Sequence, residues 1–300
     1  MSWLIVAVSA YFCSAIVALF DKYLLTELIP SHRVYAFYVG ILGVLVSFLI
    51  PFVNFSVPGF GLIFLCLLSG ALFIYSVSWF LRALQQFEAS RVVPVIGGLT
   101  PIFVFGLTAL TGDQIFNLKS GISFLLLILG SVLISLKKEK NITLKSFWIS
   151  AISAFLFSLA FFSAKFVYLY LPFWSGFIWI RIGGGVAALF FLFSKEVKEE
   201  IFKKRETFRK KTAGIFILGQ TFGVGSVILQ NWAIALIPLG FLSFVNALEG
   251  TKYVFLLVFT AFLSLNFPQI IKEEMSWKIF FQKTVAILLI GAGLILLVFK

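Results

Sequence analysis

The sequence predicts an all-α integral membrane protein with ten transmembrane helices. Of its 300 residues, 61% are hydrophobic and only 12% are charged, whereas soluble proteins are about 45–50% apolar and about 25% charged. The apolar residues form ten segments, each close to the length that a helix needs to cross a bilayer, which is roughly 20 residues. These segments lack the strict polar–apolar alternation of a membrane-spanning barrel strand, so helices are the expected structure.

The ten expected spans follow one another with short connections. They are Ser2–Phe20, Val34–Val53, Pro58–Leu81, Val92–Leu110, Leu118–Leu136, Phe147–Tyr170, Phe173–Ser194, Thr212–Leu236, Leu239–Leu263 and Ile279–Phe299. The start of the chain lacks the basic region and the small-residue cleavage site of a signal peptide, so it is expected to be the first span. The longest polar stretch, Lys195–Lys211, is expected to be a solvated or amphipathic loop.

The charges predict an orientation. Lys and Arg number 24 against 12 Asp and Glu, and 19 of the 24 cations lie in the connections after the odd-numbered spans or at their edges. The other side of the membrane holds two, Lys119 and Lys300. By the positive-inside rule, the Lys195–Lys211 loop faces the cytoplasm and both termini lie outside a multi-pass plasma-membrane protein. Because the cations separate apolar segments, nucleic acid is not an expected partner, and membrane lipids are.

Two weak echoes indicate an internal repeat. Arg82-Ala83-Leu84 is followed 150 residues later by Trp232-Ala233-Ile234, and Asp21-Lys22-Tyr23 is followed 143 residues later by Ala164-Lys165-Phe166. The echoes occur in the same order and divide the chain into five-helix halves, residues 1–142 and 143–300. An odd number of spans in each half places the second half upside down, as in transporters with inverted repeats.

Small residues and prolines recur at characteristic places in both halves. The first half contains Ala83-Leu84, Ala89-Ser90, Val92, Leu99-Thr100-Pro101, Gly112-Asp113, Gly121 and Gly130, and the second contains Ala233, Ala235-Leu236, Glu249, Glu274 and Gly291. With Arg181 in the seventh span and Lys165 late in the sixth, this pattern resembles the EamA-type transporters of the drug/metabolite transporter superfamily. The resemblance covers essentially the whole chain and implies two inverted five-helix repeats that carry a small metabolite.

The chain departs from that family pattern in four respects. Asp113 stands where the family usually has Glu, and no arginine near Tyr38 matches Arg181. Thr251 replaces the counterpart of Pro101. The loop charges also predict external termini, whereas family members usually have cytoplasmic ones.

Ionisable residues near the middle of the spans are the candidate site, because each costs at least about 2.5–3.5 kcal/mol there unless it meets water or a partner. Glu249, about ten residues into the ninth span, could bind a substrate amine or exchange a coupling proton, or it could pair with Lys252 one turn away. Arg181 could grip a carboxylate or phosphate, or it could form a fixed ion pair, for example with Glu249. Lys165 could contribute to the site or snorkel to the interface. Lys252 could likewise be a site residue or a structural one.

Polar and aromatic residues at similar depth complete the candidate set. Asn246 lies three residues before Glu249 and would share its helix face, and Tyr253 follows in the same span. Gln220, Tyr75 and Trp79 could line a cavity in which rings stack on an organic solute, although Trp79 also suits an interfacial belt. Glycines such as Gly183-Gly184-Gly185 are expected to allow close helix packing.

The expected function is secondary transport by alternating access, with export of amino acids or related small metabolites as the leading hypothesis. No P-loop motif occurs, so a gradient is expected to supply the energy, with protons as a candidate coupling ion. The alternative is a flippase for a lipid-linked sugar or a carrier of nucleotide sugars or phosphate esters. No cofactor, metal or catalytic residue is expected, because Cys13, Cys66 and His32 lack metal-ligand spacing. A membrane enzyme is less favoured, because His32 has only Asp21 and Glu27 nearby and these form no motif.

Overall fold

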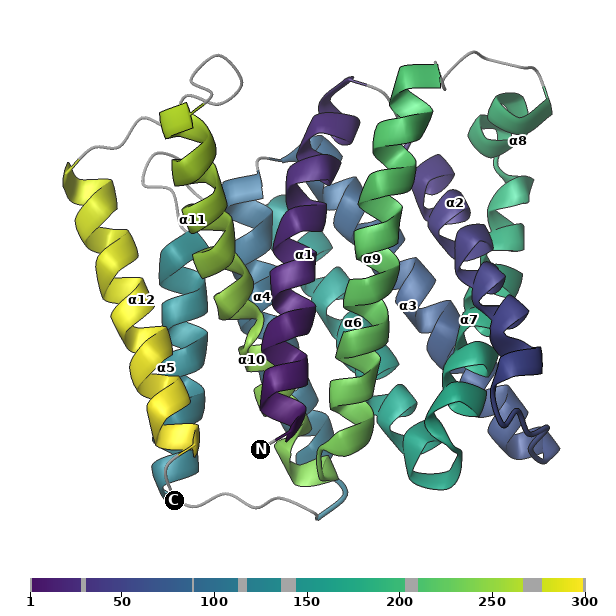
Figure 1. The fold of residues 1–300 in the computed structure, drawn as a ribbon, viewed down its shortest axis with the longest axis horizontal. Coiled ribbons are helices and arrows are strands. Elements are labelled where there is room, and N and C mark those ends of the chain that lie inside the picture. The colour runs from purple at the N-terminus through teal and green to yellow at the C-terminus, as the bar shows by residue number, and fades with distance from the viewer. Residues whose placement is uncertain are drawn as a thin grey trace.

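The computed structural model describes residues 2–27, 31–87, 89–112, 118–135, 144–202, 210–266 and 277–298, and every regular element in these ranges is a helix (Figure 1). Asp113, Glu274 and much of the basic Lys195–Lys211 loop lie outside them. The elements are α1 (Ser2–Glu27), α2 (His32–Val44), η1 (Leu45–Phe52), α3 (Phe60–Gln86), α4 (Ala89–Ala109), α5 (Leu118–Ser135), α6 (Leu144–Tyr170), α7 (Phe173–Leu189), η2 (Phe190–Phe193), α8 (Lys195–Phe202), α9 (Lys210–Leu236), η3 (Leu239–Phe241), α10 (Leu242–Ala247), α11 (Glu249–Asn266) and α12 (Trp277–Val298).

Six helical segments of the described chain are long and apolar enough to cross a membrane. They are Ser2–Phe20, His32–Phe52, Phe60–Gln86, Leu144–Tyr170, Phe173–Phe193 and Leu239–Phe259. Three shorter apolar helices, Val95–Ala109, Leu118–Ile134 and Phe281–Leu296, accompany them. Many large apolar side chains on these helices are exposed, among them Ile5, Phe64 and Leu125. Length, composition and this apolar exterior identify a helical membrane protein.

The long helices run up and down through one bundle. In Figure 1, α1 begins and α12 ends at the same end of the bundle, which we call the terminus end. The short helix α8 lies at the opposite end, which we call the α8 end. This separation of α8 from the ends of α1 and α12 matches the predicted loop positions. Which of the two ends faces the cytoplasm stays a prediction.

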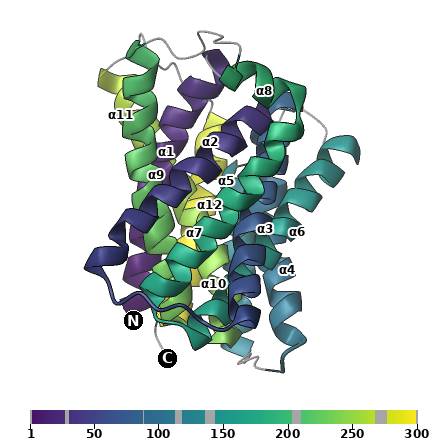
Figure 2. The ribbon, with the colours of Figure 1, turned by 90° about the vertical axis from the view of Figure 1, so that its right-hand side faces the viewer.

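Pairs of helices from the two halves of the chain pack side by side. Helix α1 packs on α9, α5 on α12, and α3 on both α6 and α7 (Figure 1). Helix α2 lies along α7 (Figure 2). Glycines bring α3 and α7 into backbone contact, because a Cβ atom on Gly70 would collide with the carbonyl oxygen of Ile180, and one on Gly183 with the backbone of Leu67. The predicted packing role of the Gly183-Gly184-Gly185 run is therefore confirmed.

Three segments differ in detail from the expected spans. The second span tightens into the 3₁₀ helix η1, which contains Pro51 and so lacks one backbone donor. The ninth span is interrupted at Leu248, between α10 and α11, and the Ser131 hydroxyl donates to the Ala247 carbonyl at this break. The polar Lys195–Lys211 stretch contains α8, whose Val197 is fully buried and anchors it to the bundle.

Candidate functional site

Arg181 lies in the middle of α7 and is 9% exposed. Its guanidinium carbon is 5.0 Å from the ring centroid of Phe73 on α3 and 5.2 Å from that of Phe177, one turn earlier on α7. Within the described part of the chain, neither an ion pair nor a hydrogen bond engages the guanidinium. A cation–π contact stabilises the charge without using its N–H donors, so these remain available to an anion.

A small cavity lies beside Arg181, where α3, α6, α7 and α9 meet. Its lining residues are Ser69, Gly70, Phe73, Ala160, Phe161, Ala164, Ile180, Arg181, Gly184 and Asn231. Its volume of about 20 Å³ holds about one water molecule and is too small for a metabolite. In this conformation the cavity therefore marks a place where both halves of the chain meet around a cation, and a larger ligand requires the helices to separate.

Asn231 forms the α9 wall of this cavity. Its side-chain oxygen accepts a hydrogen bond of 2.8 Å from the Tyr168 hydroxyl of α6, and its amide nitrogen donates 2.9 Å to the Val227 carbonyl. The sequence interpretation did not single out Asn231 or Tyr168. The sequence did contain a signal for Asn231, an amide side chain within the apolar run of α9, because a buried amide requires hydrogen-bond partners.

Lys165 lies on α6 next to the cavity residue Ala164. Its side chain is 2% exposed, and its ammonium donates a 3.1 Å hydrogen bond to the Ala235 carbonyl in the last turn of α9. The ammonium therefore reaches the end of α9 and is covered there by protein. Among the described residues no carboxylate pairs with this ammonium.

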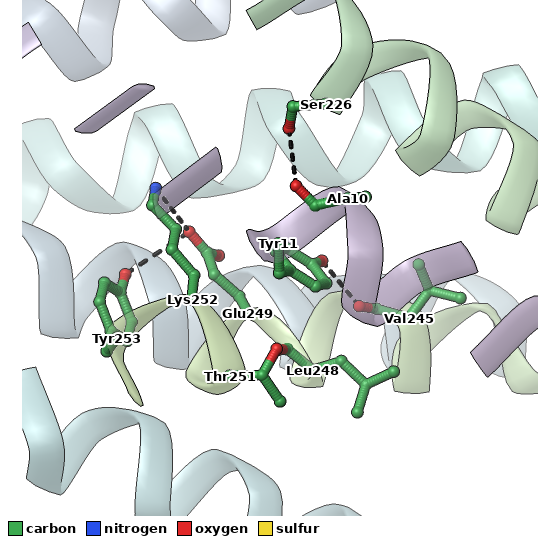
Figure 3. A network of polar contacts seen from close by, with 9 residues as sticks. All are labelled: Ala10, Tyr11, Ser226, Val245, Leu248, Glu249, Thr251, Lys252 and Tyr253. Atoms are coloured by element: carbon green, nitrogen blue, oxygen red, sulfur yellow. Dashed lines mark hydrogen bonds and ion pairs between the residues drawn. The ribbon is translucent and has the colours of Figure 1, made fainter. Parts of the chain in front are cut away.

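Glu249 belongs to a second polar cluster (Figure 3). It is the first residue of α11, where the helix dipole favours a negative charge. Its carboxylate lies 3.9 Å from the Lys252 ammonium, and the Tyr253 hydroxyl donates to it over 3.5 Å. The side chains of Glu249 and Lys252 are 24% and 20% exposed. The predicted pair of Glu249 with Lys252 is thus confirmed as a long contact, and the alternative pair of Glu249 with Arg181 is not formed.

Helices α1 and α9 frame this second cluster. The Tyr11 hydroxyl of α1 donates 2.7 Å to the Val245 carbonyl of α10, and the Ser226 hydroxyl of α9 donates 3.0 Å to the Ala10 carbonyl of α1 (Figure 3). Helix α9 therefore borders both polar sites, with Asn231 in the Arg181 cavity and Ser226 in the Glu249 cluster.

The remaining candidate residues lie apart from the Arg181 cavity. The Asn246 amide is buried and donates 3.0 Å to the Leu242 carbonyl of its own helix. The Tyr75 ring is 37% exposed and packs edge-on against a ring of η2. The Trp79 ring stacks under the Arg82 guanidinium, 4.8 Å from it. None of these three, nor Gln220, lines the cavity that the described residues form.

Comparison with solved structures supports the fold. One solved structure, described only as the crystal structure of a protein, aligns with 99% of this chain and 96% of its own, with a TM-score of 0.67 and 13% sequence identity. In all, 24 solved chains match. No protein-family model matches the chain, and no curated protein matches it. At 13% identity, the likeness establishes a shared fold.

Proposed function

We propose that this chain is a secondary transporter of the drug/metabolite transporter superfamily, which binds the carboxylate or phosphate of a small metabolite at Arg181. The observation that carries the proposal is a buried guanidinium, free of any described anionic partner, beside a cavity built from both halves of the chain. A charge at this depth costs several kcal/mol unless it is compensated. An anionic substrate supplies that compensation.

The helix packing supports two inverted repeats in this proposal. If α6 corresponds to α1, then the contact of α6 with α3 matches that of α1 with α9, and the contact of α6 with α4 matches that of α1 with α11. The contact of α3 with α7 has no comparable counterpart between α9 and α2 in the described part of the chain. A carrier with two inverted repeats has this asymmetry whenever one side of its site is closed and the other is not.

The charges favour an anionic group on the substrate. The described part of the two polar sites and their surroundings holds four charged residues, the cations Arg181, Lys165 and Lys252 and the anion Glu249. A phosphate ester or an organic acid would neutralise this excess directly. An amino acid, the leading substrate class from the sequence, would place its carboxylate at Arg181. Proton coupling at Glu249, export and the plasma membrane belong to the same proposal.

The test begins with a metabolomic comparison of cells with and without the protein, which selects candidate solutes. Purified protein in proteoliposomes is then assayed for uptake of these solutes together with amino acids, dicarboxylates and phosphate esters, with and without an imposed proton gradient. Saturable uptake of an anion-bearing solute, with an apparent affinity that Arg181→Met lowers about 10- to 100-fold, is the expected result. Uptake of cationic solutes alone, or uptake that Arg181→Met leaves unchanged, would refute the proposed site.

A further inference from the structure

We propose that Lys165 is a substrate-released latch that holds the terminus end of the cavity closed by binding the last turn of α9. This inference rests on the proposed transport function. It assigns to a second buried cation the role of linking occupation of the Arg181 cavity to movement of α9.

The Lys165 ammonium makes fewer hydrogen bonds than it could donate. An ammonium group has three N–H donors, and among the described residues this one has a single acceptor, the neutral Ala235 carbonyl, at 3.1 Å. That carbonyl is one of the last four of α9, which lack helical partners and lie at the negative end of the helix dipole. The contact therefore stabilises the closed bundle, yet it is weaker than the contact that an anion would make.

The Lys165–Ala235 contact also lies next to the cavity. Ala164, adjacent to Lys165, and Asn231, one turn before Ala235, both line the cavity. The Lys165–Ala235 contact therefore lies directly beyond the cavity, toward the terminus end of α9 (Figure 1). Rings close the same end, because the Trp232 ring centroid of α9 lies 4.8 Å from Phe173 and 6.1 Å from Trp174 at the start of α7.

The sequence of events follows from these contacts. An oxyanion that Arg181 holds in the cavity attracts the Lys165 ammonium, because a bond between two ionised groups is stronger than one from an ammonium to a neutral carbonyl. The Ala235 carbonyl then loses its donor on α6, and the end of α9 keeps the Tyr168–Asn231 hydrogen bond to α6 and the ring contacts with α7. Helix α9 can separate from α7 at that end, which opens the cavity to the terminus side.

The experiment measures access to the cavity from the terminus side. In a protein with Cys13→Ala and Cys66→Ala, Ser69→Cys places one thiol in the cavity, on α3. A membrane-impermeant anionic methanethiosulfonate is added to proteoliposomes, because loss of the Lys165 charge alone would slow its reaction, and a terminal tag identifies the vesicles whose terminus side faces the reagent. Labelling is compared for intact Lys165, for Lys165→Met and for Lys119→Met, which changes an exposed lysine at the same end of the bundle.

Lys165→Met is expected to label at least about tenfold faster than the protein with Lys165, which corresponds to the loss of one hydrogen bond from a charged group. Lys119→Met should leave the rate unchanged. Equal rates with and without Lys165, or an equal acceleration by Lys119→Met, would overturn the latch. If Lys165→Met does not fold, Lys165→Ala provides the same comparison. The readout needs no substrate, so the latch can fail while transport stands, and absence of transport does not alter the labelling result.

Discussion

Replacement of Arg181 by methionine tests whether this residue binds substrate or only stabilises the fold. Methionine keeps the length and apolar contacts of the side chain but removes its charge. The protein loses two cation–π contacts, with Phe73 and Phe177, each worth about 2 kcal/mol when desolvated. It also escapes the cost of a membrane-buried charge, about 2.5–3.5 kcal/mol. Because these effects oppose each other, Arg181→Met should change the free energy of unfolding by less than about 1.5 kcal/mol.

Substrate affinity should respond very differently. A hydrogen bond to a charged group is worth about 1.5–3 kcal/mol, and about 1.4 kcal/mol corresponds to a factor of ten. Arg181→Met should therefore weaken substrate binding about 10- to 100-fold, measured as Kd by calorimetry in detergent beside a thermal unfolding curve of the same sample. A variant that unfolds while its surviving fraction binds normally would refute the assignment and make Arg181 a structural residue.

Further predictions address packing, coupling and orientation. Gly70→Ala should lower the free energy of unfolding by about 1–3 kcal/mol because it overpacks the α3–α7 contact, whereas Gly61→Ala, on the same helix with open space around it, should leave thermal stability unchanged or slightly raised. Glu249→Gln should remove the stimulation of uptake by a proton gradient and spare solute exchange at equilibrium; stimulation equal to that of the unmodified protein would exclude Glu249 from coupling. In the cysteine-free background, Asn54→Cys should react with an impermeant maleimide from outside intact cells and Lys198→Cys only after lysis, and the reverse pattern would invert the predicted topology.

The sequence predicted the helical character of the chain and most of its helix positions, because apolar length is a local property. The interruption at Leu248 was not predicted, since the run from Leu239 to Leu263 contains no proline after its start. The break lies beside Ser131, more than one hundred residues earlier, whose hydroxyl is 3.3 Å from the Ala247 carbonyl. Such a contact exists only once α5 and α10 are side by side.

The candidate site was predictable in part for the same reason. A charge in an apolar run identifies Arg181 and Glu249 without knowledge of the fold, and the spacing of Glu249 and Lys252 gives their pairing. The hydrogen-bond partner of Lys165 depends on where α9 ends, and the sequence around Lys165 does not show this. Phe73 and Asn231 join Arg181 only through the packing of α3 and α9 on α7.

The glycine contact between α3 and α7 constrains how the molecule can change shape. At Gly70 and Gly183 the backbones of α3 and α7 touch, so no side chains lie there that could rearrange to let one helix slide past the other. These two helices should therefore move as one rigid body. Hinge motion then falls to α9, whose Trp232 ring packs on Phe173 and Trp174 of α7. Trp174 and Trp232 face each other across that joint, and their intrinsic fluorescence should shift as it opens and offer a label-free signal of turnover.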